Sequence, residues 1–498
     1  MSGSERRGGA PPIPRTLLRV ALSLILVYGL LAGGLTYWQV VQAESLTADR
    51  ANPLVLAAAR NAPRGRILDS RGQVLATNVR TENGTQLRRY SYLSTTPIIG
   101  YRTIRFGNSG LERTYDDELI GLGQLSPADR LLRKFRPEPY EPKDLALSID
   151  VRLQNRAFEL LGDQQGAVVA IEPSTGRILA LVSTPVYDPN RVVDPQGGAA
   201  YFQSLQEQPP ASSSLLNRAT QGRFTPGSVF KIVTAVAALG SGAITAQTVY
   251  PDQPAEERNG FVVDGFPIRD GHHLVTGNRA LDLVEATEVS CNIYYAHAGL
   301  DTGAEALTEW AARMGFGAPI PFDLPTSPSL VTGEDGFEGD VELASAAYGQ
   351  GETFVTPLQM ALVAATVAND GQLMRPRLVD ALLSGDEEVR TFGPEGWQRV
   401  IGPDDAATIQ RAMNEAVEGD LGRGFAGGAK VPGVPTAGKS GTAELGGQGE
   451  PHSWFIGFAP VEEPRIAIAV LVERGGFGRE RAVPMGGQLM AAYLDLAD

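Results

Sequence analysis

The sequence predicts an α+β protein whose main sheet is built from strands at both ends of one long domain. Two strand-like apolar runs, 166–172 and 176–182, are separated by the turn Pro-Ser-Thr-Gly and predict a hairpin. After a largely helical middle, strand-like runs return at 437–444, 453–458 and 465–473. A last helix is predicted over 487–496. Hairpin first, helices next and strands last is an α+β pattern, so we expect the first and last strands to share one antiparallel sheet.

An uncharged apolar segment, from Val20 to Ala43, predicts one membrane crossing ahead of this domain. About 20 apolar residues at 1.5 Å each span a hydrocarbon core of about 30 Å. A cleaved signal peptide is the alternative, but its apolar region is usually only about 7–15 residues long. Four arginines lie before the segment, and no basic residue follows until Arg50. This asymmetry predicts a cytoplasmic tail over 1–19 and an extracytoplasmic chain beyond about residue 44.

Two domains are expected outside the membrane. Residues 44–143 read as a small mixed module with several glycine turns, and this module ends in a polar, proline-broken linker over 135–143. Residues 144–498 contain the predicted hairpin, the helical middle and the last strands.

The composition disfavours several classes of function. The 498 residues carry a formal net charge of −14, which makes a nucleic-acid binder improbable because phosphate contacts need a basic surface. The single cysteine, Cys291, excludes an intrachain disulfide framework. The four histidines show no ligand spacing, so we expect no metal site.

Two short patterns resemble nucleotide-binding loops. Residues 433–440, GVPTAGKS, match the P-loop letter for letter, and residues 422–427, GRGFAG, match the dinucleotide pattern. A true P-loop follows a strand and opens a helix, whereas prolines interrupt what precedes 433–440 and a short glycine-rich run follows it. GRGFAG follows a helix-like run where a strand is required. We therefore reject both nucleotide interpretations.

Ser228 and Lys231 form the first chemistry-bearing pair. They begin an apolar helix-like run after Pro226 and Gly227, and a spacing of three residues places them on one helix face. A serine hydroxyl needs a base to become a nucleophile, and a lysine can be that base when burial keeps it neutral. Taken alone, the pair could equally be a capping serine and a surface lysine.

Two later motifs add hydroxyl, amide and amine groups. Ser290 and Asn292 can each donate and accept hydrogen bonds, as a proton relay requires, although a polar turn between helices is the simpler interpretation. The run Lys439-Ser440-Gly441-Thr442 lies on a predicted strand, where Gly441 permits close approach of a ligand. Lys439 and the hydroxyls could bind a carboxylate, and the alternative is a hairpin with a solvated lysine.

The three motifs together are more specific than any one of them. Their joint occurrence by chance is of order 0.01 for this composition, before order and context are considered. The chain has only 5 lysines against 38 arginines, and two of the five fall in these motifs. Because arginine cannot be deprotonated, a lysine base has no arginine substitute.

The motifs SVFK, SCN and KSG resemble the active-site signature of penicillin-binding proteins and serine β-lactamases. Further segments narrow the resemblance to the monofunctional, class B transpeptidases, and the compact N-terminal module and overall size resemble the penicillin-binding protein A branch. These segments are 64–76, 110–116, 166–190, 349–351, 356–361 and 452–460. The resemblance implies an antiparallel sheet flanked by helices over 144–498, a pedestal or dimerisation-like module over 44–143, and one transmembrane helix.

The resemblance also implies a role for each site residue. Ser228 attacks the D-Ala-D-Ala carbonyl of a peptidoglycan stem peptide and Lys231 accepts its proton, while Ser290 and Asn292 shuttle the proton and orient the amide. Lys439, Ser440 and Thr442 hold the substrate carboxylate, with Gly441 between them, and the backbone N–H groups of Ser228 and Thr442 form the oxyanion hole. A second stem peptide then takes the acyl group, and β-lactams acylate the same serine. The resemblance implies that this reaction needs no cofactor and no metal.

Several other classes of protein share parts of this signature with the class B transpeptidases. A class A enzyme would need a glycosyltransferase domain for which about 100 residues leave no room. A β-lactamase would need a deacylating base that is not evident in the sequence. A D-Ala-D-Ala carboxypeptidase and a non-catalytic β-lactam sensor or synthase scaffold stay as alternatives, and the resemblance implies a membrane glycosyltransferase of the SEDS type as partner. The acceptor amine and a role in division or elongation stay open.

Overall fold

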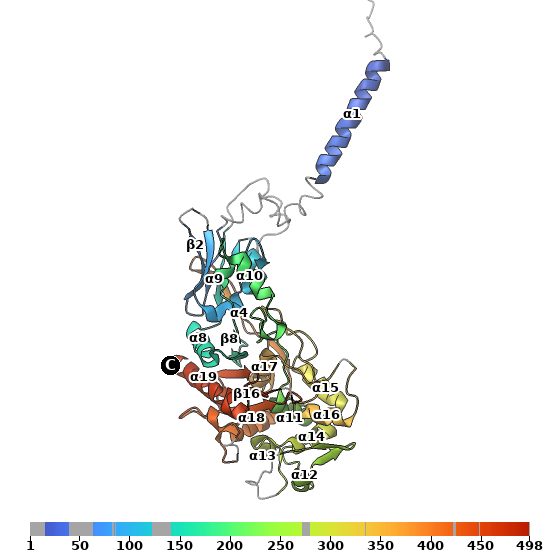
Figure 1. Ribbon diagram of the computed structural model, residues 1–498, viewed down its shortest axis with the longest axis vertical. Coiled ribbons are helices and arrows are strands. Elements are labelled where there is room, and N and C mark those ends of the chain that lie inside the picture. Colours follow the sequence, from blue (N-terminus) through green and yellow to red (C-terminus); the bar gives the residue numbers. More distant parts are fainter. Residues whose placement is uncertain are drawn as a thin grey trace, which may run out of the picture. The chain divides into compact units, whose positions relative to one another are not determined.

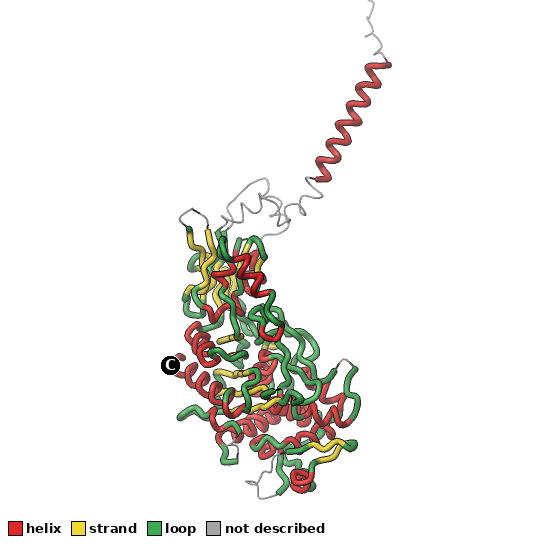
Figure 2. Tube along the Cα trace, viewed as in Figure 1, coloured by secondary structure: helices red, strands yellow, loops and turns green. Residues whose placement is uncertain are grey.

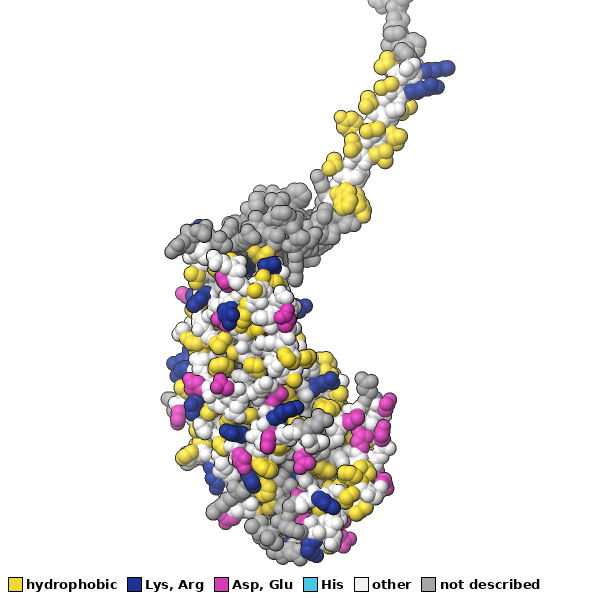
Figure 3. All heavy atoms as spheres, in the orientation of Figure 1, with side chains coloured by type: hydrophobic (Ala, Val, Ile, Leu, Met, Phe, Trp, Pro, Cys, Tyr) yellow, Lys and Arg dark blue, Asp and Glu magenta, His cyan; other side chains and the backbone are white. Residues whose placement is uncertain are grey.

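The computed structural model describes residues 15–38, 63–81, 84, 86–121, 141–270, 279–333, 335–421, 425–447 and 449–497 (Figure 1, Figure 2). The chain divides into two units, Met1–Ala62 and Pro63–Asp498. In the first unit, α1 (Arg15–Thr36) is long and apolar enough to cross a membrane, with a mean hydropathy of 2.0. Figure 3 shows apolar side chains along α1 and basic ones at one of its ends. The helix begins before Val20, and residues 39–43 of the predicted segment lie outside the described ones.

The second unit contains a five-stranded antiparallel sheet in the order β15-β16-β17-β7-β8. Its strands are β7 (Gly166–Ile171), β8 (Ile178–Thr184), β15 (Ala437–Ala443), β16 (His452–Ala459) and β17 (Ile466–Val472). β17 pairs with β7 over its length, with Ala467 opposite Ile171 and Val472 opposite Gly166. The prediction that the first and last strands share one sheet is therefore confirmed.

Helices cover both faces of this sheet. Side chains alternate between faces along a strand, so Ala167 and Val169 of β7 join the large core, in which α17 (Pro357–Ala368) packs on the sheet. Val168 and Ala170 face a second core with α8 (Val151–Leu161) and α19 (Ala482–Ala497). Burial on both faces explains why these strands read as continuous apolar runs with no polar alternation.

The helical middle of the chain packs around α11 (Lys231–Gly240), whose residues are buried from Lys231 to Leu239. Lys231 is the only charged residue in α11, so a single ammonium group enters an otherwise apolar core. Three helices pack directly on α11: α14 (Asn292–Thr302), α15 (Ala304–Arg313) and α18 (Pro403–Glu418). The other three pack on these: α12 (Gln253–Asn259), α13 (Leu283–Glu288) and α16 (Asp340–Ala347).

A second sheet has six strands in the order β13-β12-β6-β1-β2-β3. They are β1 (Ile67–Leu68), β2 (Val74–Arg80), β3 (Gln86–Tyr90), β6 (Asp144–Leu147), β12 (Val379–Ser384) and β13 (Glu387–Thr391). β6 runs parallel to β1 and antiparallel to β12, so this sheet joins strands from both sides of residue 143. Whether residue 143 is a domain boundary stays a prediction.

The remaining elements are short. The helices are α4 (Thr96–Ile99), α5 (Gly110–Thr114), α6 (Asp116–Leu119), α9 (Pro189–Val192) and α10 (Gly198–Gln206). The strands form three two-stranded pairs: β4 (Arg102–Thr103) with β5 (Gly107–Asn108), β9 (Phe261–Val263) with β10 (Phe266–Ile268), and β11 (Gln372–Met374) with β14 (Gly396–Arg399).

A buried charge cluster holds the N-terminal module together. The Glu112 carboxylate accepts hydrogen bonds from Arg64 Nε at 2.7 Å and from Arg88 Nε at 2.5 Å, and the three side chains are almost fully buried. Glu112 and Arg64 come from the segments 110–116 and 64–76 that carried the family resemblance. Their spacing in sequence gave no sign of contact, and the structure shows that each neutralises the other in the core.

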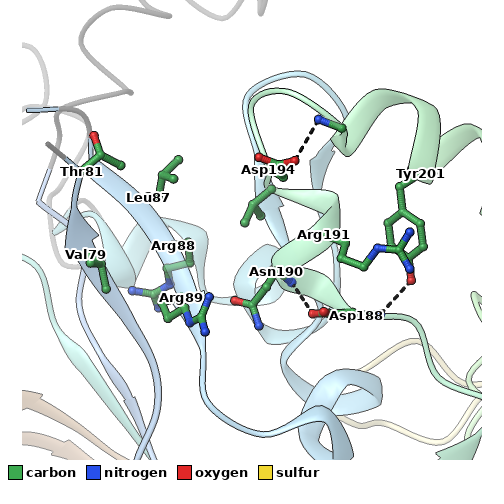
Figure 4. A pocket seen from close by; sticks show the side chains of 12 residues that line it. Val79, Thr81, Leu87, Arg88, Arg89, Asp188, Asn190, Arg191, Asp194 and Tyr201 are labelled. Atoms are coloured by element: carbon green, nitrogen blue, oxygen red, sulfur yellow. Dashed lines mark hydrogen bonds between the residues drawn. The ribbon is translucent and has the colours of Figure 1, made fainter. Parts of the chain in front are cut away.

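Asn190 of α9 forms two hydrogen bonds with one end of the edge strand β3. Its side-chain amide accepts a hydrogen bond from Tyr90 N–H and donates one to Tyr90 O, both at 3.0 Å. Beside it lies a cavity of about 620 Å³ between β3 and the α9–α10 segment, in which Arg191 stacks on the Tyr201 ring at 3.8 Å (Figure 4). No residue of the three Ser/Lys motifs lines this cavity.

We expect Glu112→Gln to destabilise the protein by about 3–5 kcal/mol, because the buried Arg88 guanidinium loses the carboxylate it pairs with and Arg64 keeps Asp116 but loses Glu112. Urea unfolding measures the loss. The matched control is Glu309→Gln, which breaks an exposed pair with Arg313 at 2.5 Å and should cost no more than about 0.5 kcal/mol. Equal losses in the two variants would show that the buried cluster contributes no more than a surface ion pair.

Candidate active site

Ser228 lies on a turn of 3-10 helix, Gly227–Phe230, that runs directly into α11. Gly227 has a φ of +56°, and a Cβ there would lie 2.6 Å from the Thr442 carbonyl oxygen. Gly349, with a φ of +83°, packs on the other side, and its carbonyl oxygen accepts Gly227 N–H at 2.9 Å. Two glycines therefore let three chain segments meet at the residue before Ser228.

The Ser228 side chain is half-buried and available to a ligand. Its hydroxyl makes no hydrogen bond within the part of the chain that the structure describes. The strand with the third motif approaches it closely, because Gly441 has no side chain where a Cβ would lie 3.0 Å from Pro226 O and Val229 Cγ1. From the sequence we expected Gly441 to permit close approach of a ligand to the strand. In the structure, the turn that carries Ser228 makes such a close approach.

Lys231 is fully buried one turn after Ser228. Its Nζ donates to Ser290 O at 2.5 Å and to Asn292 Oδ1 at 2.7 Å, and lies 3.3 Å from Ser290 Oγ. Burial lowers the pKa of Lys231 to about 8, against the opposing charge of Asp270. A lysine with this pKa is neutral in an appreciable fraction of molecules near neutral pH, which a general base requires.

Ser290 lies between the two lysines of the motifs. Lys439 Nζ donates to Ser290 Oγ at 2.8 Å, and Lys439 is as buried as Lys231. Burial, and then the charge of Lys231, lowers the pKa of Lys439 well below its usual value. Ser290 has a φ of +59°, a conformation rare for residues other than glycine, which turns the chain between α13 and α14. The three motifs thus converge on one hydroxyl.

Strand β15 brings the last motif to the site. It is an edge strand of the five-stranded sheet and pairs with β16, with Lys439 opposite Ile456 and Gly441 opposite Trp454. Ser440 is buried, and Thr442 Oγ1 accepts a hydrogen bond from Gly478 N–H at 3.1 Å. All eight site residues predicted from the sequence, over 228–231, 290–292 and 439–442, are therefore brought to one region.

Sequence reasoning missed Asp270. Its carboxylate accepts hydrogen bonds from the N–H groups of Asn292 and, at 3.4 Å, of Ile293, at the start of α14. No sequence signal identifies it, because a capping residue normally lies next to its helix and Asp270 lies 22 residues before Asn292.

Trp454 and His452 support the site from the neighbouring strand. Trp454 Nε1 donates to Thr225 O at 3.0 Å and so fixes the chain three residues before Ser228. His452 Nδ1 accepts Arg474 N–H at 3.1 Å, and burial lowers its pKa to about 4, so the ring is neutral and structural. The sequence segment HSWFIGFAP is informative because its side chains brace the serine turn.

The structure agrees with rejecting the nucleotide interpretation of 433–440, since residues from Ala437 to Ala443 form a strand where a P-loop would open a helix. Residues 422–424 of the second pattern lie outside the described chain. Within the described residues, no group of three or more His, Cys, Asp or Glu side chains could hold a metal ion.

The arrangement is suited to acyl transfer. It combines the Ser228 hydroxyl, the buried Lys231 amine of lowered pKa one turn further along the chain, and the Ser290 hydroxyl, which lies within 3.3 Å of the Lys231 and Lys439 amines. Comparison with known families agrees: residues 166–491 match the penicillin binding protein transpeptidase domain, and residues 64–139 match the penicillin binding protein A dimerisation domain. The chain therefore belongs to the penicillin-binding proteins with a transpeptidase domain, and it is a serine transpeptidase.

The sequence of the chain is similar to those of proteins in the penicillin-binding protein A branch. The chain is 35% identical to the peptidoglycan D,D-transpeptidase PbpA of Mycolicibacterium smegmatis, over 96% of this chain and 99% of that one. It is 34% identical to PbpA of Mycobacterium tuberculosis, over 96% of both chains. A ceftriaxone acyl-enzyme structure of penicillin-binding protein A from M. tuberculosis superposes with a TM-score of 0.76 at 32% identity, covering 87% of this chain and 99% of that one. The predicted family and fold class are confirmed.

Proposed function

We propose that this chain cross-links peptidoglycan stem peptides through an acyl-enzyme on Ser228. The observation that carries the assignment is the meeting of Lys231 and Lys439 on Ser290 Oγ beside an unengaged Ser228 hydroxyl. The relatives named D,D-transpeptidase support the reaction and the substrate class, stem peptides ending in D-Ala-D-Ala.

Lys231 is the base of the acylation step in this proposal. A neutral amine has two N–H groups and one lone pair, and the two N–H groups of Lys231 have acceptors in Ser290 O and Asn292 Oδ1. The lone pair is then left for the Ser228 proton. As the hydroxyl oxygen bonds to the D-Ala carbonyl carbon, its proton passes to Lys231 and a tetrahedral oxyanion forms.

The backbone N–H groups of Ser228 and Thr442 are proposed to bind this oxyanion. Ser228 lies at the start of a helical segment, where N–H groups are unpaired, and the Thr442 backbone contacts the same turn. The terminal D-Ala leaves when its nitrogen receives a proton. Ser290, which is hydrogen-bonded to Lys439 and close to Lys231, is positioned to deliver it.

Lys439, Ser440 and Thr442 are proposed to bind the carboxylate of the terminal D-Ala. An edge strand suits this role, because an extended peptide can lie along β15 with its carbonyl at Ser228. Asn292 would orient the amide of the stem peptide. The amine of a second stem peptide then attacks the acyl-enzyme and closes the cross-link, and a β-lactam would acylate Ser228 in the same way.

The proposed orientation places the N-terminus of α1 in the cytoplasm, because the arginines precede the apolar segment. Residues 1–19 are then the tail, 20–43 the anchor, 44–143 the pedestal module and linker, and 144–498 the transpeptidase domain. A membrane glycosyltransferase of the SEDS type is the proposed partner, since a monofunctional enzyme needs a separate source of glycan chains.

We expect tagged penicillin to modify the peptide that contains Ser228, and Ser228→Ala to abolish the adduct, as peptide mass spectrometry would show. With a D-Ala-D-Ala stem peptide as donor and an amine as acceptor, the protein should release D-Ala and form the joined product. Hydrolysed donor alone at every acceptor concentration would identify a carboxypeptidase. An adduct with no D-Ala release would identify a sensor or scaffold.

Lys231→Arg should slow acylation by about 10²–10⁴-fold or more, because a guanidinium keeps the positive charge but cannot accept a proton near neutral pH. Lys439→Arg is the matched variant and should lose less, since the role proposed for Lys439 is carboxylate binding, which requires no proton transfer to its side chain. The readout is the second-order acylation rate with a fluorescent penicillin, and thermal melting confirms folding. Equal, mild losses in both variants would contradict the base assignment.

The orientation predicts that protease added to osmotically opened cells digests the chain beyond about residue 44. A soluble cytoplasmic protein serves as the control and should stay intact. Immunoblotting with a tag at the C-terminus follows the cleavage. Protection of the C-terminal tag while the membrane is intact would reverse the proposed orientation.

A further inference from the structure

The start of α14 is capped from a distant part of the chain. The N–H groups of Asn292 and Ile293 point to the Asp270 carboxylate, and Tyr294 N–H points to Cys291 Sγ at 3.3 Å. The first N–H groups of a helix have no partner within it, so these acceptors satisfy them. Asp270 follows β10, which belongs to a separate two-stranded hairpin.

This cap connects Asp270 to the proposed base through one residue. Asn292 is held at its backbone by Asp270 and, at its side-chain Oδ1, accepts a hydrogen bond from Lys231 Nζ at 2.7 Å. Asn292 Nδ2 also donates to Arg269 O at 3.4 Å. The segment 269–270 therefore fixes both the backbone and the amide of Asn292, and with them the orientation of the Lys231 amine.

Asp270 also brings negative charge to two buried amines. Burial lowers the pKa of both Lys231 and Lys439, and the negative charge of Asp270 opposes this fall. Among the described groups nearby, burial raises the pKa of Cys291, of Tyr295 and of Tyr348, so these three are neutral at ordinary pH. Two further acidic residues lie behind them: Glu257, 3.8 Å from Cys291 Sγ, and Glu444, whose charge acts on Tyr348. The helix N-terminus itself favours an anion at Asp270.

We propose that Asp270 is a positioning residue of the acyl-transfer site, which aims Asn292 at Lys231 and sets the pH at which Lys231 can accept the Ser228 proton. This inference rests on the proposed function. In this scheme Asp270 acts through the helix start and through its charge, and it is given no part in binding or transforming the substrate.

A pH profile of the acylation rate distinguishes the effect of the Asp270 charge from the effect of its contact with the helix start. The acylation rate of the parent should rise with pH through about 8, because the protonated Lys231 cannot act as a base below its pKa. Asp270→Asn keeps an acceptor oxygen for the helix N–H groups and removes the charge. Without that charge the ammonium form is less favoured, so the rising limb should move to lower pH by roughly one unit.

Three variants test this with a fluorescent penicillin between about pH 5.5 and 9.5, a range that brackets the limb. Asp270→Glu keeps the charge and should leave the limb within about 0.3 of the parent. The matched control is Asp282→Asn, which alters the cap of the neighbouring helix α13, where Asp282 Oδ1 accepts Glu285 N–H at 3.0 Å. This control should lower the melting temperature slightly without moving the limb.

An unmoved limb in a folded, acylated Asp270→Asn variant would overturn the proposal, even if its maximal rate fell. An equal shift in Asp282→Asn would also overturn it, because the effect would then follow from any loosened helix cap. Failure of the proposed function shows elsewhere, as a parent protein that forms no adduct on Ser228, so the two failures are distinguishable.

Discussion

Burial of the Lys231 and Lys439 ammonium groups around Ser290 Oγ is the constraint on which the rest of the site depends. Two like charges in an apolar interior are costly, so burial and mutual repulsion favour the neutral amines. The protein tolerates this because Ser290, Asn292 and the carbonyl groups around them satisfy the amine protons. The same cost that destabilises the charged lysines makes one of them usable as a base near neutral pH.

The fold positions the groups of the site by packing segments that are distant in sequence against the turn that carries Ser228. Gly227 and Gly441 leave no room for side chains where the serine turn meets β15, and Gly349 lies against the backbone of Gly227. Trp454 ties the same turn to β16 through Thr225 O. The glycine contacts are made by backbone atoms, so a side chain at any of these three positions would push the segments of the site apart.

Much of the fold and the site could be predicted from the sequence, because the signals were local. The strands from 166 to 182 and from 437 to 473 are apolar runs bounded by turns, and the structure places them in one sheet. Ser228 and Lys231 are three residues apart on one helical face, which spacing alone reveals. Sequence could not find Asp270 or the partnership of Arg64 with Glu112, because those contacts join residues far apart in the chain.

The sequence by itself determined the residue types, the helical and strand periods, the apolar segment α1, and through the motif resemblance the family. The tertiary structure decided which side chains can exchange a proton in the site, because their pKa values depend on burial and on neighbours that lie far away in sequence. It also decided that β12 and β13 complete the sheet of the N-terminal module. Local patterns fix what each segment can form, whereas the pairing of distant segments is chosen by the packing of the whole chain.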